Sequence, residues 1–69
     1  MHQEIISTIK QRREHLGLTQ ESLSELAGIG LRTLKNIELG ESSPTLRTLE
    51  KISDVLGMEL KVTVKTPIN

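Results

Sequence analysis

The chain has 69 residues, no cysteine and no aromatic residue, and its nine basic side chains balance nine acidic ones. A domain this small is marginal on its core alone, so an aliphatic core without disulfides favours regular helix packing, association between copies, or both. Recognition of unpaired bases relies on aromatic stacking, which this composition excludes. Zero net charge argues against non-specific polyanion binding, although a small reader of duplex DNA needs only local positive charge.

The composition also argues against catalytic and membrane proteins. With two histidines and no cysteine, no residues have metal-ligand spacing, and no glycine-rich loop is present to hold a phosphate. We therefore expect no cofactor, no metal and no enzyme activity. No apolar run approaches the roughly 18 to 20 residues of a membrane span, and the N-terminal residues lack the apolar segment of a secretory signal. The expected location is the cytoplasm, with no membrane partner.

The first predicted helix covers residues 3–16. Ile5, Ile9 and Leu16 recur there at helical spacing, with either Arg12 or Arg13 on the same face. Gly17 follows as a helix stop. This segment is interpreted as an amphipathic helix that covers the core and makes at most a phosphate contact.

Residues 18–43 are predicted to form the central feature, two short helices over residues 20–27 and 31–39 joined by a glycine turn. Thr19 stands in the N-cap position of the first helix, and Gly28 and Gly40 end the two helices. The residues expected to face the core are Leu23, Leu26, Ala27, Ile29, Leu34 and Ile37. Two helices joined in this way are typical of the helix-turn-helix motif, whose second helix enters the major groove of DNA.

The remaining faces of the second helix carry donors suited to phosphates and base edges. These residues are Arg32, Thr33, Lys35 and Asn36. The alternative is that Arg32 and Lys35 are ordinary solubilising charges. The glycine turn and the preceding helix favour the DNA-binding interpretation over this alternative.

A fourth helix is predicted to begin at Pro44, with Ser43 as its cap, and to end before Gly57. Its apolar residues follow a spacing of three and four, which predicts that it closes the core. The inward positions expected from this spacing are Leu46, Leu49, Ile52, Val55 and Leu56.

The last segment changes from helical to alternating periodicity. Met58, Leu60, Val62 and Val64 alternate with polar residues, which predicts a half-buried β-strand over residues 58–66. Because no second strand is predicted, we expect this strand to pair with its counterpart across a dimer axis. The alternatives are a frayed tail or a strand resting on its own helices. Residues 67–69 are expected to be disordered.

Residues 5–57 resemble the phage repressor/Cro-type helix-turn-helix regulators, also called XRE-like. The motifs that carry the resemblance are Gly17-Leu18-Thr19-Gln20, Leu23-Ser24-Glu25-Leu26-Ala27-Gly28, Ile37-Glu38 with Gly40, and Pro44-Thr45-Leu46. The resemblance implies an all-α fold, a compact four- to five-helix bundle of the lambda-repressor-like type, over residues 1–57. It also implies a homodimer that binds a palindromic operator in double-stranded DNA and regulates transcription, as a repressor.

The resemblance assigns roles to individual residues as well. Gln20 would bind a phosphate and support the recognition helix, and Arg32 would read guanine. Leu31 stands where relatives commonly have a polar side chain that contacts a base. Because leucine is apolar, it could only touch a thymine methyl group or hold the helix at a distance from the bases. The implied DNA-contacting residues are Gln20, Leu31, Arg32, Thr33, Lys35, Asn36, Ser42 and Ser43.

Two further positions are structural in such relatives. Arg13 and Glu38 match a pair that forms an internal salt bridge, which implies a structural role for both. Gly30 departs from the pattern, because relatives usually have Ser or Thr capping the recognition helix here. Glycine is a tolerable N-cap, but it puts a phosphate contact at this position in doubt.

The tail narrows the resemblance to the HipB-type antitoxins. In these proteins the terminal strands of two subunits pair, which implies dimerisation through Met58, Leu60, Val62 and Val64. It also implies a cognate toxin protein as a partner. A protein-interaction module on the same fold, with weak or no DNA binding, is the alternative function.

Overall fold

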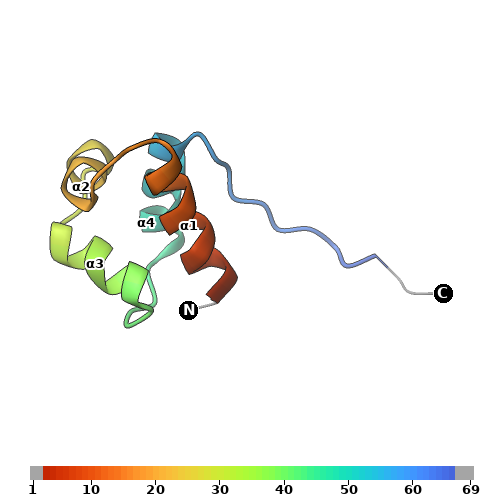
Figure 1. Cartoon of the computed structure of the whole chain (residues 1–69). Coiled ribbons are helices and arrows are strands. Elements are labelled where there is room, and N and C mark those ends of the chain that lie inside the picture. Colours follow the sequence, from red (N-terminus) through yellow and green to blue (C-terminus); the bar gives the residue numbers. More distant parts are fainter. Residues whose placement is uncertain (1–2, 67–69) are drawn as a thin grey trace.

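The computed structural model describes residues 3–66 of the chain. Four helices make up this described part: α1 (Gln3–His15), α2 (Gln20–Ala27), α3 (Leu31–Leu39) and α4 (Leu46–Leu56). α2 packs against α3 and α4, and α1 packs against the same two helices, as Figure 1 shows. The predicted all-α bundle is therefore confirmed with four helices, and α2 and α3 have the predicted bounds.

The core is aliphatic and draws on every helix. Five side chains have no accessible surface at all: Leu23, Leu34, Ile37, Ile52 and Leu56. Ile29, in the turn between α2 and α3, packs against this cluster as predicted. Burial of these side chains is the main favourable term that holds the short helices together, since isolated helices of this length are marginal in water.

The buried face of α1 differs from the predicted one. Ile6 and Ile9 are buried, whereas Ile5 and Leu16 are exposed. Two adjacent isoleucines fit two helix faces that differ by about 100°, and only packing against α3 and α4 selects one of them. Of the two arginines left open by the periodicity, the structure buries Arg13.

Two other expected core positions are also wrong. Leu26 is 63% exposed, because α2 turns Leu23, Ser24 and Ala27 inward instead. The Ser24 hydroxyl remains satisfied there, since it donates to the Glu21 carbonyl at 2.8 Å. Leu46, at the first position of α4, is 69% exposed because the core is reached only from Leu49 onward.

α4 begins two residues later than predicted, at Leu46 instead of Pro44. Thr45, not Ser43, is the N-cap, with extended backbone angles and a side-chain oxygen that accepts the Thr48 N–H at 3.2 Å. Pro44 therefore precedes the helix instead of opening it. Both Ser43 and Thr45 are good capping residues, and the path of the preceding loop decides between them.

The tail after Gly57 is extended and projects away from the helices (Figure 1). Met58 packs against the core, and its N–H donates to the Ser53 carbonyl at 2.9 Å. Beyond Met58 the tail forms no strand within residues 3–66. The expected β-strand is therefore not shown in the single chain, and pairing across a dimer stays a prediction. The predicted disorder of residues 67–69 lies outside the described residues.

Candidate nucleic-acid interface

The turn between α2 and α3 fixes where the second helix begins. Gly28 has a φ of 69° and a ψ of 36°, the left-handed conformation that a side chain disfavours. Its N–H donates to the Glu25 carbonyl at 3.2 Å, and the Ile29 N–H donates to the Ser24 carbonyl at 3.0 Å. This double closure is a Schellman-type helix end. Since Ile29 is also packed on the core, the chain enters α3 in one direction.

α3 has one anchored face and one outward face. Leu34, Ile37 and Glu38 are buried. The outward residues are the exposed Arg32, Thr33 and Lys35 and the half-buried Leu31 and Asn36. The structure thus places five of the predicted DNA-contacting residues on α3 outside its buried face, and Thr33 lies away from the side that carries Leu31 and Lys35.

One residue on this surface was missed by the sequence interpretation. Leu39 is 69% exposed and lines a shallow hollow on α3 with Leu31, Arg32, Lys35 and Asn36. Leu31, Lys35 and Leu39 are four residues apart in succession, so they form one stripe along the helix. That spacing was the signal available, but Leu39 was taken only as the end of the helix.

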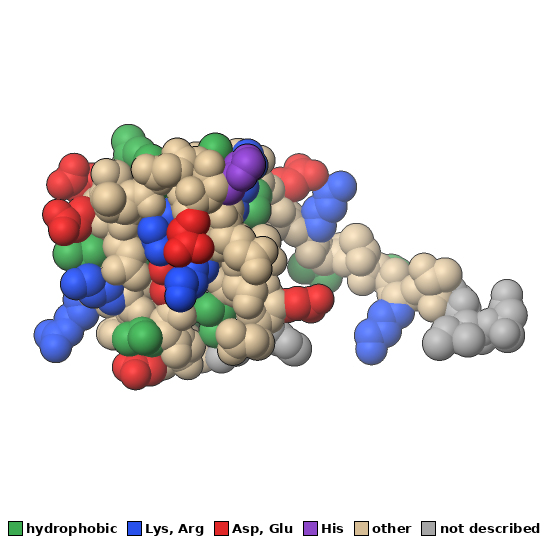
Figure 2. Space-filling view, viewed as in Figure 1, with side chains coloured by type: hydrophobic (Ala, Val, Ile, Leu, Met, Phe, Trp, Pro, Cys, Tyr) green, Lys and Arg blue, Asp and Glu red, His purple; other side chains and the backbone are tan. Residues whose placement is uncertain are grey.

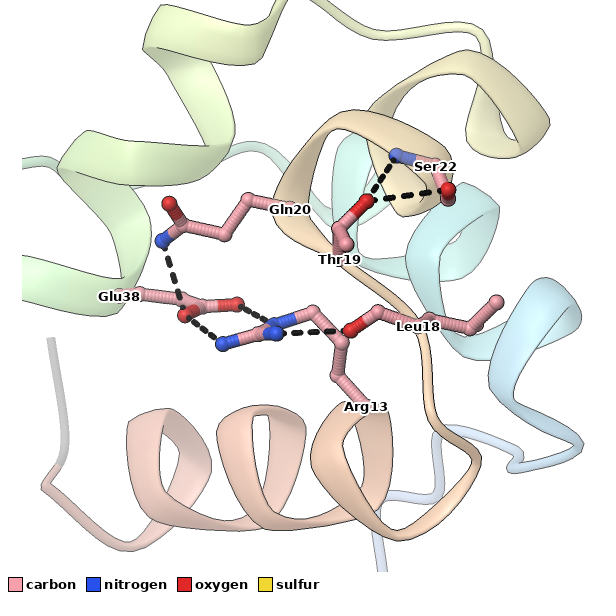
Figure 3. Close-up of polar contacts among 6 residues, drawn as sticks. All are labelled: Arg13, Leu18, Thr19, Gln20, Ser22 and Glu38. Carbon is pink, nitrogen blue, oxygen red and sulfur yellow. Dashed lines mark hydrogen bonds and ion pairs between the residues drawn. The ribbon is translucent and has the colours of Figure 1, made fainter.

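A buried ion pair ties α3 to α1. The Arg13 Nε donates to the Glu38 Oε2 at 2.8 Å, and its Nη2 donates to Oε1 at 3.0 Å (Figure 3). The third guanidinium nitrogen, Nη1, donates to the Leu18 carbonyl at 2.8 Å. This is the pair that the resemblance implies. The Leu18 contact extends it to the loop that leads into α2.

Gln20 joins the same network from the first turn of α2. Its Nε2 donates to the Glu38 Oε1 at 3.1 Å (Figure 3). Among residues 3–66 the Gln20 amide oxygen and the second N–H of Nε2 have no partner, so both can bind another group. The neighbouring Thr19 caps α2, because its Oγ1 accepts the Ser22 N–H at 3.0 Å. The position of the Gln20 side chain is therefore set by the carboxylate at the end of α3.

The charges of the network cancel, so it adds little field at the surface. The hydrogen bonds to Glu38 raise the pKa of the Arg13 guanidinium above its ordinary value, against the opposing effect of burial. Because the pKa of Arg13 is higher in the folded chain than in the unfolded chain, the charged guanidinium stabilises the fold fully at any pH below its unfolded-state pKa. This contribution is lost only when the pH rises through the folded-state pKa, in the strongly alkaline range. The Arg13 guanidinium therefore stays charged at neutral pH.

Beside this network, α2 and α3 carry exposed charges of opposite sign. Arg32 and Lys35 are exposed on α3, and Glu21 and Glu25 are exposed on α2. In Figure 2 basic side chains project at the edge where Figure 1 places α3, with acidic side chains above them near α2. A phosphate backbone is attracted to α3 and repelled by this part of α2.

The two loop serines differ from each other. Ser43 is exposed, as a contact with the DNA backbone would require. The Oγ of Ser42 is buried and has no hydrogen-bond partner among the described residues. Ser42 therefore has to rotate its side chain outward before it can donate to a phosphate.

Within residues 3–66, no helix is both long and apolar enough to cross a membrane. The same residues contain no group of three or more His, Cys, Asp or Glu side chains placed to hold a metal ion.

Comparison with known proteins identifies the class. The helix-turn-helix family model matches residues 9–62. The chain is 41% identical over 51 residues to an uncharacterized HTH-type transcriptional regulator of Methanothermobacter thermautotrophicus. The matched region covers 74% of this chain and 74% of that relative. The chain belongs to the helix-turn-helix family.

Two further relatives carry similar names. The chain is 36% identical over 61 residues to the HTH-type transcriptional regulator SutR of Escherichia coli. It is 33% identical over 58 residues to an uncharacterized HTH-type transcriptional regulator of Haemophilus influenzae. These matches cover 88% and 84% of this chain but only 34% and 59% of the relatives. The chain thus spans a part of these two longer proteins.

Proposed function

We propose that the chain regulates transcription by binding double-stranded DNA as a homodimer, with α3 in the major groove. The observation that carries this proposal is the outward surface of α3, which presents Arg32, Lys35 and Asn36 while Glu38 anchors the opposite side. The names of the relatives, HTH-type transcriptional regulators, support it. The DNA-binding part is residues 1–57, and residues 58–66 hold two copies together.

Each contact has a chemical basis. The forked donors of Arg32 suit the two acceptors of guanine, and Asn36 suits adenine or a phosphate. Leu31 offers only apolar surface, which fits a thymine methyl group. The remaining contacts go to the DNA backbone or to base edges, and they are assigned to Thr33, Lys35 and the loop residues Ser42 and Ser43.

Gln20 binds a phosphate at the N-terminus of α2. The unpaired N–H groups and the positive end of the helix dipole favour an anion there. Because Glu38 already holds the Gln20 amide at 3.1 Å, the side chain loses little further freedom on binding. The nearby exposed Glu21 opposes this contact and lowers its net contribution.

The small size of the recognition helix favours a homodimer. A single recognition helix contacts only a few base pairs, whereas a dimer places two helices about 34 Å, one DNA turn, apart. The matching operator is a palindrome. The exposed apolar residues of the tail, Val62 and Val64, are the surface assigned to association.

The narrower proposal is that the protein is a repressor and the antitoxin of a toxin–antitoxin operon. The alternating tail supports this subtype. The test is the neighbouring reading frame: its product should stop growth when expressed alone, and coexpression of this chain should restore growth. A neighbour without toxicity contradicts the antitoxin role and leaves the DNA-binding proposal intact.

The alternative is a protein-interaction module on the same fold. Leu31 and the 69% exposed Leu39 give the α3 surface apolar ends, and the net charge of the chain is zero. Such a surface fits a protein partner as well as a DNA groove.

One experiment separates these functions. Duplexes are selected from a random pool with the full chain, and binding of the selected duplex is measured by fluorescence anisotropy at several salt concentrations. Arg32→Ala should weaken binding by roughly 5- to 150-fold and relax the preference at one base pair. Lys51→Ala, an exposed change on α4, is the control and should leave affinity unchanged.

Two outcomes would contradict the proposal. Unchanged affinity in Arg32→Ala would remove the role assigned to that residue. An intact dimer that selects no duplex even at low salt would favour the interaction module.

A further inference from the structure

The tail has two chemically different faces. Its even-numbered residues from 58 to 64 are apolar: Met58 packs on the core, Leu60 is 42% exposed, and Val62 and Val64 are 99% and 94% exposed. Its odd-numbered residues are polar. Lys61 Nζ lies 3.3 Å from Glu59 Oε1, which places both charges on one face of the extended chain. The apolar face therefore begins on the body and continues into solvent.

A groove opens beside the base of the tail. It has a volume of about 280 Å³ and is lined by apolar residues of α1, α4 and the tail, with Glu4, Thr8, Ser53 and Glu59 at polar positions. The apolar lining residues are Ile5, Ile9, Leu49, Met58 and Leu60. The apolar face of the tail and this groove thus form one continuous surface, which a second apolar strand can cover.

The start of the tail is held in place by a bond from α1. The Nε of Arg12 donates to the carbonyl of Leu56, the last residue of α4, at 2.8 Å. These residues are 44 positions apart in the chain, so local sequence patterns did not indicate the contact. Because the origin of the tail is fixed, less conformational entropy is lost when the tail pairs.

We propose that two copies of this chain pair their tails antiparallel, in the register centred on Val62. This inference rests on the proposed homodimer and specifies its contacts. Val62 lies opposite the partner's Val62, Leu60 lies opposite the partner's Val64, and Glu59 lies opposite the partner's Lys65. The partner's Val64 then extends the apolar surface at the edge of the groove.

Charge selects this register among the symmetric ones. Residues directly opposite each other in an antiparallel pair share a face, and like charges there are unfavourable. A centre at Lys61 places two Lys61 side chains opposite each other, and a centre at Thr63 places Lys61 opposite Lys65. A centre between two residues places apolar side chains opposite polar ones. A centre at Val64 pairs no like charges, but it places Val62 opposite Thr66 and Lys61 opposite Pro67, which has no N–H to donate to the ladder.

The remaining competitor is a register centred on Leu60. It pairs Glu59 with the partner's Lys61, so its charges are also complementary. However, it pairs only residues 58–62 before the strand meets Gly57 and the end of α4. The Val62 register pairs residues 58–66, and a longer ladder satisfies more backbone groups. A two-stranded ribbon is marginal by itself, which makes the added length and the groove contact decisive.

Disulfide formation between single cysteines introduced into the tail reports the register directly, because the chain has no cysteine of its own. The full chain is prepared as Leu60→Cys, Lys61→Cys, Val62→Cys and Thr63→Cys and is oxidised under identical conditions. Directly opposite Cα atoms lie about 4.5 to 5.5 Å apart, within the disulfide range of roughly 4.4 to 6.8 Å. Displaced pairs lie at about 7 Å or more.

Val62→Cys should become a covalent dimer on non-reducing gels while the other three variants stay mostly monomeric. Cross-linking centred on residue 60, 61 or 63 instead would overturn the Val62 register but keep the homodimer. A wild-type chain that sediments as a monomer at all concentrations would overturn the homodimer itself. Interference optics are used, because the chain lacks aromatic residues.

A charge exchange provides the second arm. Glu59→Lys and Lys65→Glu should each weaken the dimer by roughly two- to thirtyfold, since two symmetric pairs are lost. The double variant should recover most of the wild-type affinity. Recovery by Glu59→Lys with Lys61→Glu, and not with Lys65→Glu, would identify the Leu60 register and overturn the Val62 one. Lys51→Glu on α4 is the matched control and should leave the dimer unchanged.

Discussion

The helical body and the tail use apolar residues in opposite ways. In the body, side chains such as Leu34 and Ile52 are fully buried by other helices of the same chain. In the tail, Val62 and Val64 have almost their whole surface exposed. The body therefore buries its core residues within the chain, whereas the alternating apolar residues of the tail beyond Leu60 stay exposed in the single chain and are covered only in the proposed dimer. Changes in the body should alter unfolding, and changes in the tail should alter association.

The largest effect is expected from the buried ion pair of the body. Arg13→Ala or Glu38→Ala leaves an unpaired buried charge, which should lower the free energy of unfolding by about 3 to 5 kcal/mol. The double change Arg13→Met with Glu38→Leu should cost much less, because no charge is left unpaired. Urea unfolding followed by far-ultraviolet circular dichroism measures this. A single-variant loss as small as that of the exposed Lys35→Ala, within about 0.5 kcal/mol, would show that the pair is not buried.

The next effect concerns the tail. Removal of residues 61–69 retains Met58 and Leu60, so the body should unfold as before, within about 0.5 kcal/mol per chain. Association should be lost, and affinity for the selected operator should fall by roughly a hundredfold or more, because the second half-site is no longer linked. Removal of residues 67–69 alone is the control. A truncated chain that still sediments as a dimer would place the interface on the body.

A smaller effect distinguishes the two candidate caps of α4. Thr45→Ala removes the acceptor of the Thr48 N–H and should cost about 1 kcal/mol of unfolding free energy. Ser43→Ala should change it by less than about 0.5 kcal/mol. Thermal unfolding of both variants tests this comparison. A larger loss for Ser43→Ala would restore the cap that the sequence pattern predicts.

The smallest effect is a gain at the start of α3. Gly30→Ser supplies the missing side-chain cap and should stabilise the body by a few tenths of a kcal/mol. Among the described residues, a Cβ at Gly30 meets only the Thr33 Oγ1, at an ordinary distance of 3.6 Å. Gly28→Ala is the opposite control, since the left-handed φ of 69° should make it cost about 1 to 2 kcal/mol. A loss of stability in Gly30→Ser would contradict the N-cap assignment.

The parts of the fold that could be predicted depend on local signals. Thr19, Gly28 and Gly40 mark helix ends through their own backbone and side-chain chemistry, and α2 and α3 have the expected bounds. The outward donors of α3 also follow from helical spacing, once Leu34 and Ile37 define the inner face. Such signals act within a few residues, which is why the sequence alone sufficed.

The parts that could not be predicted depend on contacts between distant elements. Adjacent isoleucines left the rotation of α1 undetermined, and Leu26 shares helical spacing with Leu23 although the neighbouring helices bury Ser24 instead. The bond from Arg12 to the Leu56 carbonyl has no local signature. The tail goes one step further, because in the proposed dimer its partner belongs to a second copy of the chain.

The extended tail also acts as a ruler in the proposed dimer. With Val62 at the centre, eight residue steps separate Met58 from its counterpart, or about 26 Å at the usual strand rise. Moving the centre by one residue changes this separation by about 7 Å, which corresponds to roughly two base pairs of duplex DNA. In this proposed dimer, the distance between the two operator half-sites therefore depends on tail residues outside the DNA-contacting surface of α3, and a tail of different length is expected to favour a different half-site spacing.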